Sequence, residues 1–280
     1  MTLRDWLRKG EADLLAGPHP DRARRDAETL LLHHIGKSRA WLLTHLDEDF
    51  GGCRAIAYAA ILQRRLAGEP IQYITGECEF FGLPLRVTHA VLIPRPETEH
   101  LVEAVLSLAE GFTRPRILDV GTGSGAIAVA LAKHLADANI TGTDVSSSAL
   151  ALATENPKHH DVAIRFLLGD LLVPVADETF DIIVSNPPYV PEADHDLLPV
   201  EVRDYEPAEA LFAGSDGLCI YRRLIPEAYA ALVPGGYLVL EIGFGQADTI
   251  ADLMQSSGFS SIDFTPDLQG IPRVVIARRS

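Results

Sequence analysis

Apolar positions divide the chain into three stretches with different periodicity. In the first stretch they recur at helical spacing, as at Ala27, Leu30 and Leu31. Capping residues and glycines then bound four predicted helices, which run from Thr2 or Asp5 to Leu15, from the cap Asp21 to Gly36, from Ser38 to Leu46 and from Arg54 to Leu66. We therefore expect a small helical bundle as an N-terminal domain over residues 1–70.

The second stretch, residues 71–88, is β-rich and punctuated by glycine. It contains Ile71-Gln72-Tyr73-Ile74-Thr75-Gly76 and then Glu79-Phe80-Phe81-Gly82-Leu83-Pro84-Leu85. Short β-branched and aromatic runs separated by glycine are typical of paired strands. The pattern predicts a β-hairpin that links the N-terminal domain to the rest of the chain.

In the third stretch, residues 89–280, short apolar runs alternate with helical patterns. The seven predicted strands are 116–120, 140–144, 163–169, 180–185, 236–243, 261–265 and 273–278. Continuous apolar strands alternating with helices are typical of a parallel sheet covered on both faces. We expect a doubly wound, Rossmann-like α/β domain that binds ligands at the carboxyl ends of its strands, around the first and the fourth.

Composition narrows the function classes. With 47% hydrophobic and 22% charged residues, and no apolar run near the length of a membrane helix, the chain is typical of globular proteins. The start of the chain lacks the apolar core of a signal peptide. Three widely spaced cysteines form neither a disulfide framework nor a metal pair. We therefore expect a cytoplasmic protein without a membrane partner or a metal.

Charge is uneven along the chain. Residues 1–88 carry 12 basic and 12 acidic side chains, whereas residues 89–280 carry 12 basic and 27 acidic ones. A polyanion meets repulsion at such an acidic domain unless a basic groove opposes it, and no run of Lys or Arg indicates one. Stable nucleic-acid binding is therefore not expected.

A glycine-rich turn follows the first predicted strand of the α/β domain. Asp119-Val120-Gly121-Thr122-Gly123-Ser124-Gly125 lets the main chain approach a ligand at a helix N-terminus. Asp144 ends the next strand, where its carboxylate can accept hydrogen bonds from both ribose hydroxyls of a nucleoside. At the end of the third strand, Asp170 can bind an adenine amino group, with Leu171 packing or donating its N–H nearby.

Two cofactors fit a glycine turn followed by a strand-end carboxylate. A nicotinamide dinucleotide is one, but its pyrophosphate prefers the spacing G-x-G-x-x-G, whereas this chain has G-x-G-x-G. The earlier third glycine, with Asp119 leading the turn, better suits a nucleoside that carries an amino-acid tail. The spacing therefore favours S-adenosylmethionine.

Asn186-Pro187-Pro188-Tyr189 ends the apolar run of the fourth strand. The prolines hold the segment extended and stiff. The Asn186 side-chain oxygen and the Pro187 carbonyl can accept the two hydrogens of a planar amide or amine, and Tyr189 offers a ring for stacking. We hypothesise that Asn186, Pro187, Pro188 and Tyr189 bind such a nitrogen and direct it at an electrophile. An ordinary proline-rich turn fits the bare tetrapeptide equally well.

A second proline-rich segment precedes the first helix of the α/β domain. Pro94-Arg95-Pro96-Glu97-Thr98-Glu99 is rigid, and Arg95 and Glu97 are candidates for lining a catalytic cleft. Spacing alone favours the simpler interpretation, a stiff loop whose acidic residues occupy the first turn of the next helix.

With these residues, the chain resembles the class I methyltransferases and, more narrowly, the protein-(glutamine-N5) methyltransferases of the HemK/PrmC family. The resemblance covers almost the full length and includes Tyr205-Glu206-Pro207 and Glu241-Ile242-Gly243. It implies transfer of a methyl group from S-adenosylmethionine to the glutamine of the Gly-Gly-Gln motif in peptide chain release factors. It also implies that the N-terminal domain docks this protein substrate.

Three rival functions remain open. A nicotinamide-dependent oxidoreductase is disfavoured by the glycine spacing. Asn-Pro-Pro-Tyr is shared with N6-adenine DNA and RNA methyltransferases, because the amino group of adenine satisfies the same two acceptors. A non-catalytic, cofactor-binding scaffold is the third, although it would be expected to have lost the tetrapeptide that is intact here.

Overall fold

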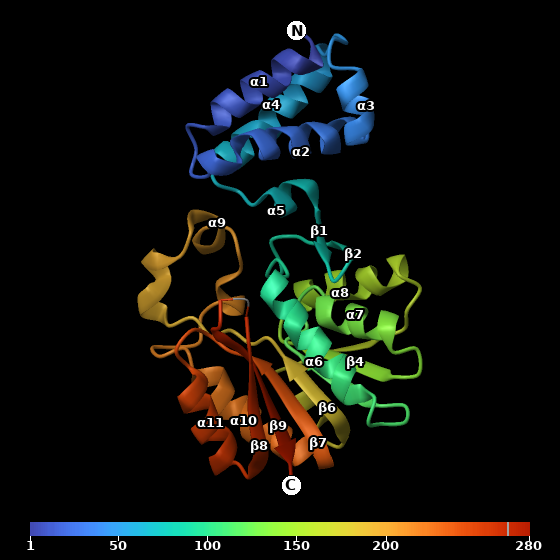
Figure 1. Ribbon diagram of the computed structural model, residues 1–280, viewed down its shortest axis with the longest axis vertical. Coiled ribbons are helices and arrows are strands. Elements are labelled where there is room, and N and C mark those ends of the chain that lie inside the picture. Colours follow the sequence, from blue (N-terminus) through green and yellow to red (C-terminus); the bar gives the residue numbers. More distant parts are fainter. Residues whose placement is uncertain (268) are drawn as a thin grey trace. The chain divides into compact units, whose positions relative to one another are not determined.

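The computed structural model describes residues 1–267 and 269–280 and divides into two compact units. The first unit comprises residues 1–77 together with residues 198–205, and the second comprises residues 78–197 and 206–280 (Figure 1). The expected boundaries at residues 70 and 88 did not include the short return of the chain to the first unit. The two units are described separately below.

The first unit is helical, as the apolar spacing predicted. Its helices are α1 (Leu3–Leu14), η1 (Pro20–Arg22), α2 (Ala23–Ile35), α3 (Arg39–Thr44), α4 (Gly52–Leu66), α5 (Ile71–Thr75) and α9 (Val200–Arg203). Thr2 caps α1, because its hydroxyl accepts from the Asp5 N–H while the Asp5 carboxylate accepts from the Thr2 N–H. The expected cap at Asp21 is wrong, since Pro20 begins the turn η1 and Arg22 takes the cap position of α2.

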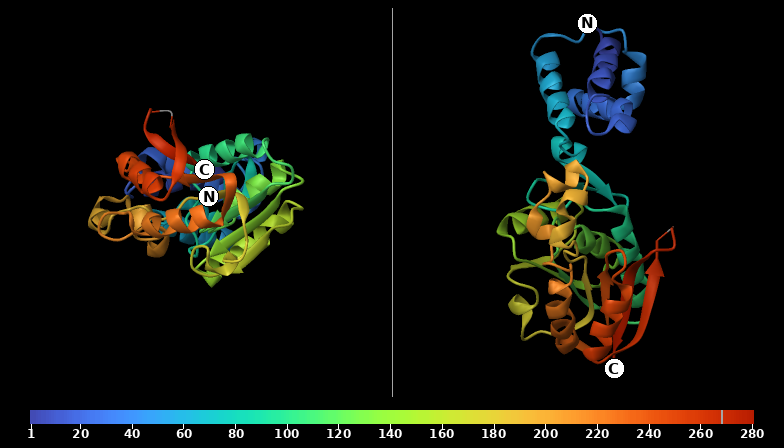
Figure 2. Two further views of the ribbon diagram at one scale, coloured as in Figure 1. Left: turned by 90° about the horizontal axis from the view of Figure 1, so that it is seen from below. Right: turned by 90° about the vertical axis from the view of Figure 1, so that its left-hand side faces the viewer.

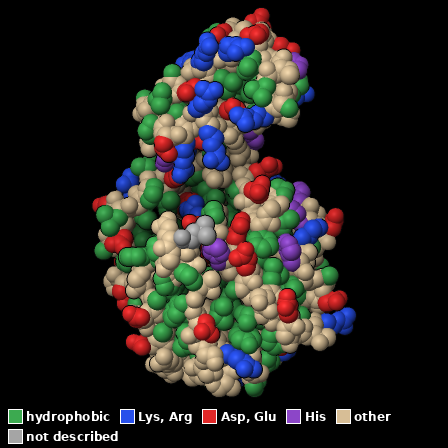
Figure 3. All heavy atoms as spheres, viewed as in Figure 1, with side chains coloured by type: hydrophobic (Ala, Val, Ile, Leu, Met, Phe, Trp, Pro, Cys, Tyr) green, Lys and Arg blue, Asp and Glu red, His purple; other side chains and the backbone are tan. Residues whose placement is uncertain are grey.

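A buried ion pair joins α9 to the helices of this first unit. Arg65 on α4 is almost fully buried, and its guanidinium donates to the Asp26 carboxylate at 2.7 Å and to the Glu201 carboxylate at 3.2 Å. A buried guanidinium needs such partners, because an unpaired buried charge is strongly destabilising. On the face drawn in Figure 3, other Lys and Arg side chains gather over this unit.

Residues 71–76 do not form the expected strand. They fold as the helix α5, which begins after Pro70 and ends at Gly76, where the backbone is left-handed with φ of 78°. Tyr73 and Ile74 are buried. The expected hairpin is confirmed only for the later residues, as β1 (Glu77–Phe80) and β2 (Leu83–Arg86).

The second unit contains the predicted seven-stranded sheet, in the order β5-β4-β3-β6-β7-β9-β8. Its strands are β3 (Arg116–Val120), β4 (Asn139–Asp144), β5 (Arg165–Leu168), β6 (Phe180–Ser185), β7 (Leu232–Glu241), β8 (Phe259–Pro266) and β9 (Pro272–Arg279). The sheet is not parallel throughout, because β9 pairs antiparallel with both of its neighbours. Only a short connection separates β8 from β9, which suits an antiparallel pair.

Helices cover both faces of this sheet. The helices are η2 (Pro96–Thr98), α6 (Glu99–Ala109), α7 (Ala126–His134), α8 (Ser147–His159), η3 (Val173–Val175), η4 (Glu192–Leu197), η5 (Ala208–Ala210), α10 (Cys219–Ala231) and α11 (Ala247–Ser256). Apolar residues of α6 and α7 pack with Ile117 of β3, whereas those of α10 and α11 pack with Leu118. Figure 2 shows the strands from two further directions, with helices on both sides.

The strand order creates the expected ligand crevice. From β3 the chain moves to β4 on one side and later returns to β6 on the other. The connections that leave the carboxyl ends of β3 and its neighbours therefore run to opposite sides of β3. A crevice opens at this point, where the strand order reverses.

Candidate active site

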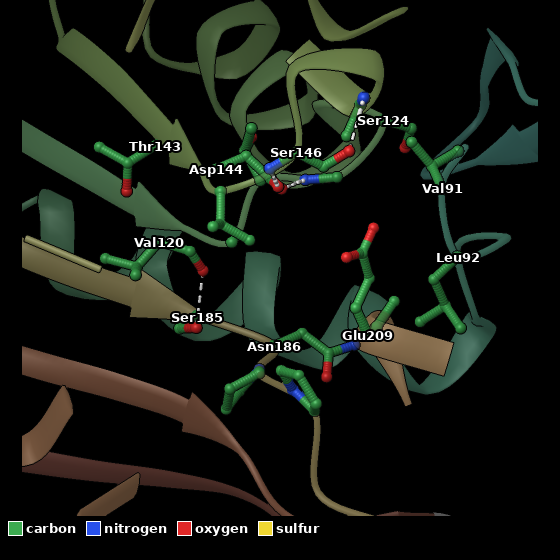
Figure 4. Close-up of a pocket in the computed structure, with 18 of the residues that line it drawn as sticks. Val91, Leu92, Val120, Ser124, Thr143, Asp144, Ser146, Ser185, Asn186 and Glu209 are labelled. Carbon is green, nitrogen blue, oxygen red and sulfur yellow. Dashed lines mark hydrogen bonds between the residues drawn. The ribbon is translucent and has the colours of Figure 1, made fainter. Parts of the chain in front are cut away.

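A cavity lies at the carboxyl ends of β3, β4 and β6, and all of its walls belong to the second unit. Figure 4 shows Asp144 and Ser146 on one wall, with Asn186 and Glu209 on the opposite wall. The residues predicted from sequence that line it are Gly121, Thr122, Gly123, Ser124, Asp144, Asp170, Leu171, Asn186, Pro187 and Pro188. The fold thus brings the glycine turn and the Asn-Pro-Pro segment to one cavity.

Glycine permits the backbone path of the turn after β3. Gly121 and Gly123 have φ of 69° and 56°, in the left-handed region that most residues avoid. The Gly121 N–H donates to the Thr143 carbonyl at 2.8 Å, which ties the turn to the end of β4. Gly125 also has positive φ and forms the N-terminal cap of α7, although it does not line the cavity.

Asp144 fixes the loops on either side of the expected nucleoside position. Its carboxylate accepts from the Gly123 N–H and from the Ser146 N–H, both at 2.8 Å. Each carboxylate oxygen keeps a further lone pair for another donor. Asp144 can therefore order the glycine turn and still accept hydrogen bonds from two ribose hydroxyls.

Asp119 is fully buried beneath the turn and does not itself line the cavity. One of its oxygens accepts from the Thr122 hydroxyl at 2.6 Å, while Oδ1 has no hydrogen-bond partner among the described residues. Burial, reinforced by the charge of Asp144, raises the pKa of Asp119 to about 7. A nearby positive charge would stabilise the buried Asp119 carboxylate. S-adenosylmethionine carries two positive charges, one on its sulfur and one on its amino group. The residues present therefore fit this cofactor.

The free energy of unfolding of the cofactor-free protein should fall as the pH rises, because the pKa of Asp119 is raised in the folded state. Its pKa is about 7 when folded and close to the ordinary carboxyl value of about 4 when unfolded, so the folded state binds more protons between these values. Stability is then lost as the pH rises from about 4 to about 7. Urea unfolding measures this effect. Between pH 5 and pH 8, the free energy of unfolding of wild type should fall by about 2 kcal/mol relative to that of Asp119→Asn. A constant difference between the two proteins would refute this assignment.

The end of β5 provides two further cavity residues. Asp170 lines the cavity, but its carboxylate also accepts a hydrogen bond from the Arg223 guanidinium. This pair is half exposed, so water screens it. Leu171 lines the cavity with φ of 48°, a left-handed conformation that is uncommon for leucine. Their adenine contacts remain predictions.

Asn186, Pro187 and Pro188 line the cavity directly after β6, whereas Tyr189 lies outside its lining. The Tyr189 hydroxyl donates to a Glu241 carboxylate oxygen at 3.3 Å. The main-chain carbonyl of Tyr189 accepts a hydrogen bond from the Gln246 side-chain amide at 3.1 Å. Burial raises the pKa of Tyr189, so it remains a neutral hydrogen-bond donor at physiological pH. Its stacking on a substrate amide is still a prediction.

The proline-rich segment around Arg95 contributes to the cavity wall, but not through the two residues predicted from the sequence. Pro94 and Thr98 line the cavity, and Arg95 and Glu97 are absent from its lining. Arg95 instead donates to the buried Glu206 carboxylate at 2.5 Å, and Glu97 is exposed. A substrate contact by either residue remains a prediction.

Three polar residues near the cavity were not proposed as site residues from the sequence. Thr98 lines the cavity, and the Glu209 carboxylate points into it from η5 (Figure 4). Glu241 lies behind Thr98 at the end of β7. The signal for Glu241 was its place at a strand end beside β6, since Ser185 pairs with Leu240 in the parallel register.

Within residues 1–267 and 269–280, no group of three His, Cys, Asp or Glu side chains is placed to hold a metal ion. None of the helices described is both long and apolar enough to cross a bilayer.

Comparison with known families gives two matches. The Methyltransferase small domain matches residues 97–201, and the PrmC N-terminal domain matches residues 5–76. The chain is 42% identical to a release factor glutamine methyltransferase of Koribacter versatilis over 280 residues, which cover 100% of this chain and 99% of that protein. It is 43% identical to the protein of the same name from Geobacter sulfurreducens over 274 residues, which cover 98% and 94% of the two chains.

A solved structure with the same fold carries the cofactor. This protein is the 16S rRNA N2 G1207 methyltransferase RsmC of T. thermophilus, in complex with AdoMet and guanosine. It is 18% identical to this chain, and the match covers 73% of this chain and 50% of that chain with a TM-score of 0.54. At this identity the likeness concerns the fold alone.

Proposed function

This chain belongs to the release factor glutamine methyltransferase family, and from that premise we propose that it methylates the side-chain amide nitrogen of a release factor glutamine. It is an S-adenosylmethionine-dependent methyltransferase. The observation that carries the proposal is that Asn186 and Pro187 share one cavity with the glycine turn. A methyl donor in that turn would face an amide held by the two oxygens.

The cofactor would supply an electrophilic methyl group on a sulfonium centre. In our proposal the glycine turn binds its amino-acid tail, and Asp144 accepts from its ribose hydroxyls. Asp170 and Leu171 adjoin its adenine, and buried Asp119 stabilises its positive charge. The chain thereby fixes the direction in which the methyl group points.

The amide nitrogen of glutamine is a poor nucleophile, because its lone pair is delocalised into the carbonyl. We infer that the Asn186 side-chain oxygen and the Pro187 carbonyl accept its two hydrogens. These contacts orient the nitrogen toward the methyl group and stabilise the positive charge that it gains. The new N–CH3 bond forms as the S–CH3 bond breaks, with the bonding pair returning to sulfur. The product nitrogen then loses a proton to water, so no residue needs to act as a general base.

The substrate is a whole protein, and we propose that the helical first unit docks it. A match to the PrmC N-terminal domain over residues 5–76 supports this role, since the relative whose match spans the whole chain, these residues included, is named for release factors. The glutamine would come from the Gly-Gly-Gln motif, whose glycines allow a narrow loop to enter a cavity. Because release factors act in the cytoplasm, we place the reaction there.

The direct test is transfer of labelled methyl groups from S-adenosylmethionine to a purified release factor. We expect one methyl group on the Gly-Gly-Gln glutamine, located by peptide sequencing in a mass spectrometer. A release factor with that glutamine replaced by glutamate serves as the matched control and should stay unlabelled. Parallel reactions contain adenine-rich DNA or RNA. Labelling of adenine instead of the glutamine would support the N6-adenine alternative and overturn our proposal.

A further inference from the structure

Three side chains from separate elements form a hydrogen-bonded chain that begins in the cavity wall and ends behind it. The Thr98 hydroxyl, at the start of α6, donates to the Glu241 carboxylate at the end of β7, at 2.6 Å. The Asn186 side-chain nitrogen, after β6, lies 3.0 Å from the same Thr98 oxygen. Thr98 and Glu241 are buried, so water competes little for the contact between them.

Glu241 is held in place by two more contacts. Its second carboxylate oxygen lies 3.3 Å from the Tyr189 hydroxyl, and its main-chain carbonyl accepts from the Tyr221 hydroxyl at 2.7 Å. Two hydroxyls thus face its two carboxylate oxygens. This arrangement suits an ionised carboxylate, which accepts hydrogen bonds at both oxygens and donates none. Burial raises the pKa of Glu241, and the hydrogen bonds from Thr98 and Tyr189 partly oppose this rise.

The order of donors decides which way the Asn186 amide faces. The oxygen and the nitrogen of an asparagine side chain have the same shape, so only hydrogen bonds distinguish the two orientations. Thr98 has one hydroxyl hydrogen, which Glu241 takes. The Thr98 oxygen can then only accept, and it must face the Asn186 NH2 group. The reversed amide would bring two acceptor oxygens together.

The Asn186 oxygen is therefore left for the substrate. It accepts no hydrogen bond within the described part of the chain, and Asn186 lines the cavity. We propose that Glu241 and Thr98 are positioning residues that lock the Asn186 amide with its oxygen available to the acceptor nitrogen. This inference rests on the proposed function and deepens it, because it explains how Asn186 selects an NH2 group over a carbonyl oxygen.

A substitution pair at Thr98 tests the lock. Thr98→Val keeps the size and the branching of the side chain but removes its hydroxyl, so the Asn186 amide can reverse. Loss of one oriented hydrogen bond in a transition state typically lowers kcat 10²- to 10³-fold. The loss should be smaller here, because part of the Thr98→Val molecules would still hold the Asn186 amide in the correct orientation. We expect kcat to fall about 30-fold, with KM for the release factor changed less than about threefold. Thr98→Ser restores the hydroxyl and should recover kcat to within about threefold of wild type.

A second variant removes the negative charge behind Thr98. Glu241→Gln presents a donor as well as an acceptor, so one of the two facing hydroxyls loses its acceptor oxygen. We expect kcat to fall about tenfold, again with little change in KM. Because this variant is nearly isosteric, it keeps the test informative if Thr98→Val fails to fold, which thermal unfolding would reveal.

The outcomes separate this inference from the function on which it rests. If wild type transfers no methyl group to glutamine, the proposed function fails. If wild type is active but Thr98→Val and Glu241→Gln, both folded, match its kcat, the function stands and the lock is refuted. A loss confined to KM would also refute it, since that result indicates binding without orientation. A fall in kcat that Thr98→Ser reverses would support it.

Discussion

Replacing Asn186 with alanine should lower kcat for methyl transfer to the release factor by about 1000-fold or more. The variant loses the side-chain oxygen that we propose orients the substrate amide and stabilises the charge on its nitrogen, and losing such an interaction typically costs 10²- to 10³-fold. Misorientation of a delocalised lone pair adds to this loss. Cofactor affinity should change less than about threefold, because the glycine turn and Asp144 are untouched.

Single-turnover assays and calorimetric titration with S-adenosylmethionine measure the two effects separately. Asn139→Ala is the matched control, because Asn139 is exposed at the amino end of β4, opposite the cavity. It should retain full activity. If Asn186→Ala still transfers methyl groups at a rate near that of wild type, Asn186 does not orient the substrate.

Replacing Asp144 with alanine should weaken S-adenosylmethionine binding by about 100-fold or more. In our proposal the change removes two hydrogen bonds that the ribose hydroxyls donate to the Asp144 carboxylate, each contributing about 1.5 kcal/mol or more. It also releases the Gly123 and Ser146 N–H groups that order the cavity wall. Both effects act on binding, so calorimetry should record the full loss.

The control for this variant has the same change of charge. Asp137→Ala removes an exposed carboxylate from the loop before β4 and should bind the cofactor as wild type does. Asp144→Ala should still unfold cooperatively, because Asp144 is only partly buried at the surface of the cavity. Unchanged affinity in Asp144→Ala would mean that the nucleoside lies elsewhere.

Buried parallel strands were the most predictable elements. The bounds of β3 and β6 match the expected residues, because each strand is an uninterrupted apolar run between clear polar or turn residues. The same reasoning misplaced Ile71–Thr75, whose β-rich composition belongs to a short helix. Its helical state depends on Pro70 at one end and left-handed Gly76 at the other, and these signals are weaker than the composition.

Local sequence patterns could not predict the direction of β9 or the return of residues 198–205 to the first unit. Apolar periodicity places a strand in a sheet but does not give the direction in which it runs. Glu201 joins the first unit through a contact with Arg65, which is far away in the sequence. Partners at such separation leave no periodic signal.

The strand-end logic predicted much of the cavity. Parallel strands bring their carboxyl ends together, so the glycine turn, Asp144, Asp170 and Asn186 were expected to meet, and they line one cavity. The Thr98–Glu241 contact was missed because it joins two residues 143 positions apart through a side-chain hydrogen bond. Arg95 was expected in the cleft, but its pairing with Glu206 has the same long-range origin.

Two oxygens of the Asn186-Pro187 segment are proposed to hold a glutamine amide against the methyl donor. A crystal structure with S-adenosylhomocysteine and a Gly-Gly-Gln peptide tests this claim most directly. We predict that the glutamine nitrogen lies within about 3.2 Å of both the Asn186 side-chain oxygen and the Pro187 carbonyl, and faces the sulfur. A glutamine amide bound outside hydrogen-bonding distance of both oxygens, or with its carbonyl oxygen turned toward Asn186, would contradict the claim.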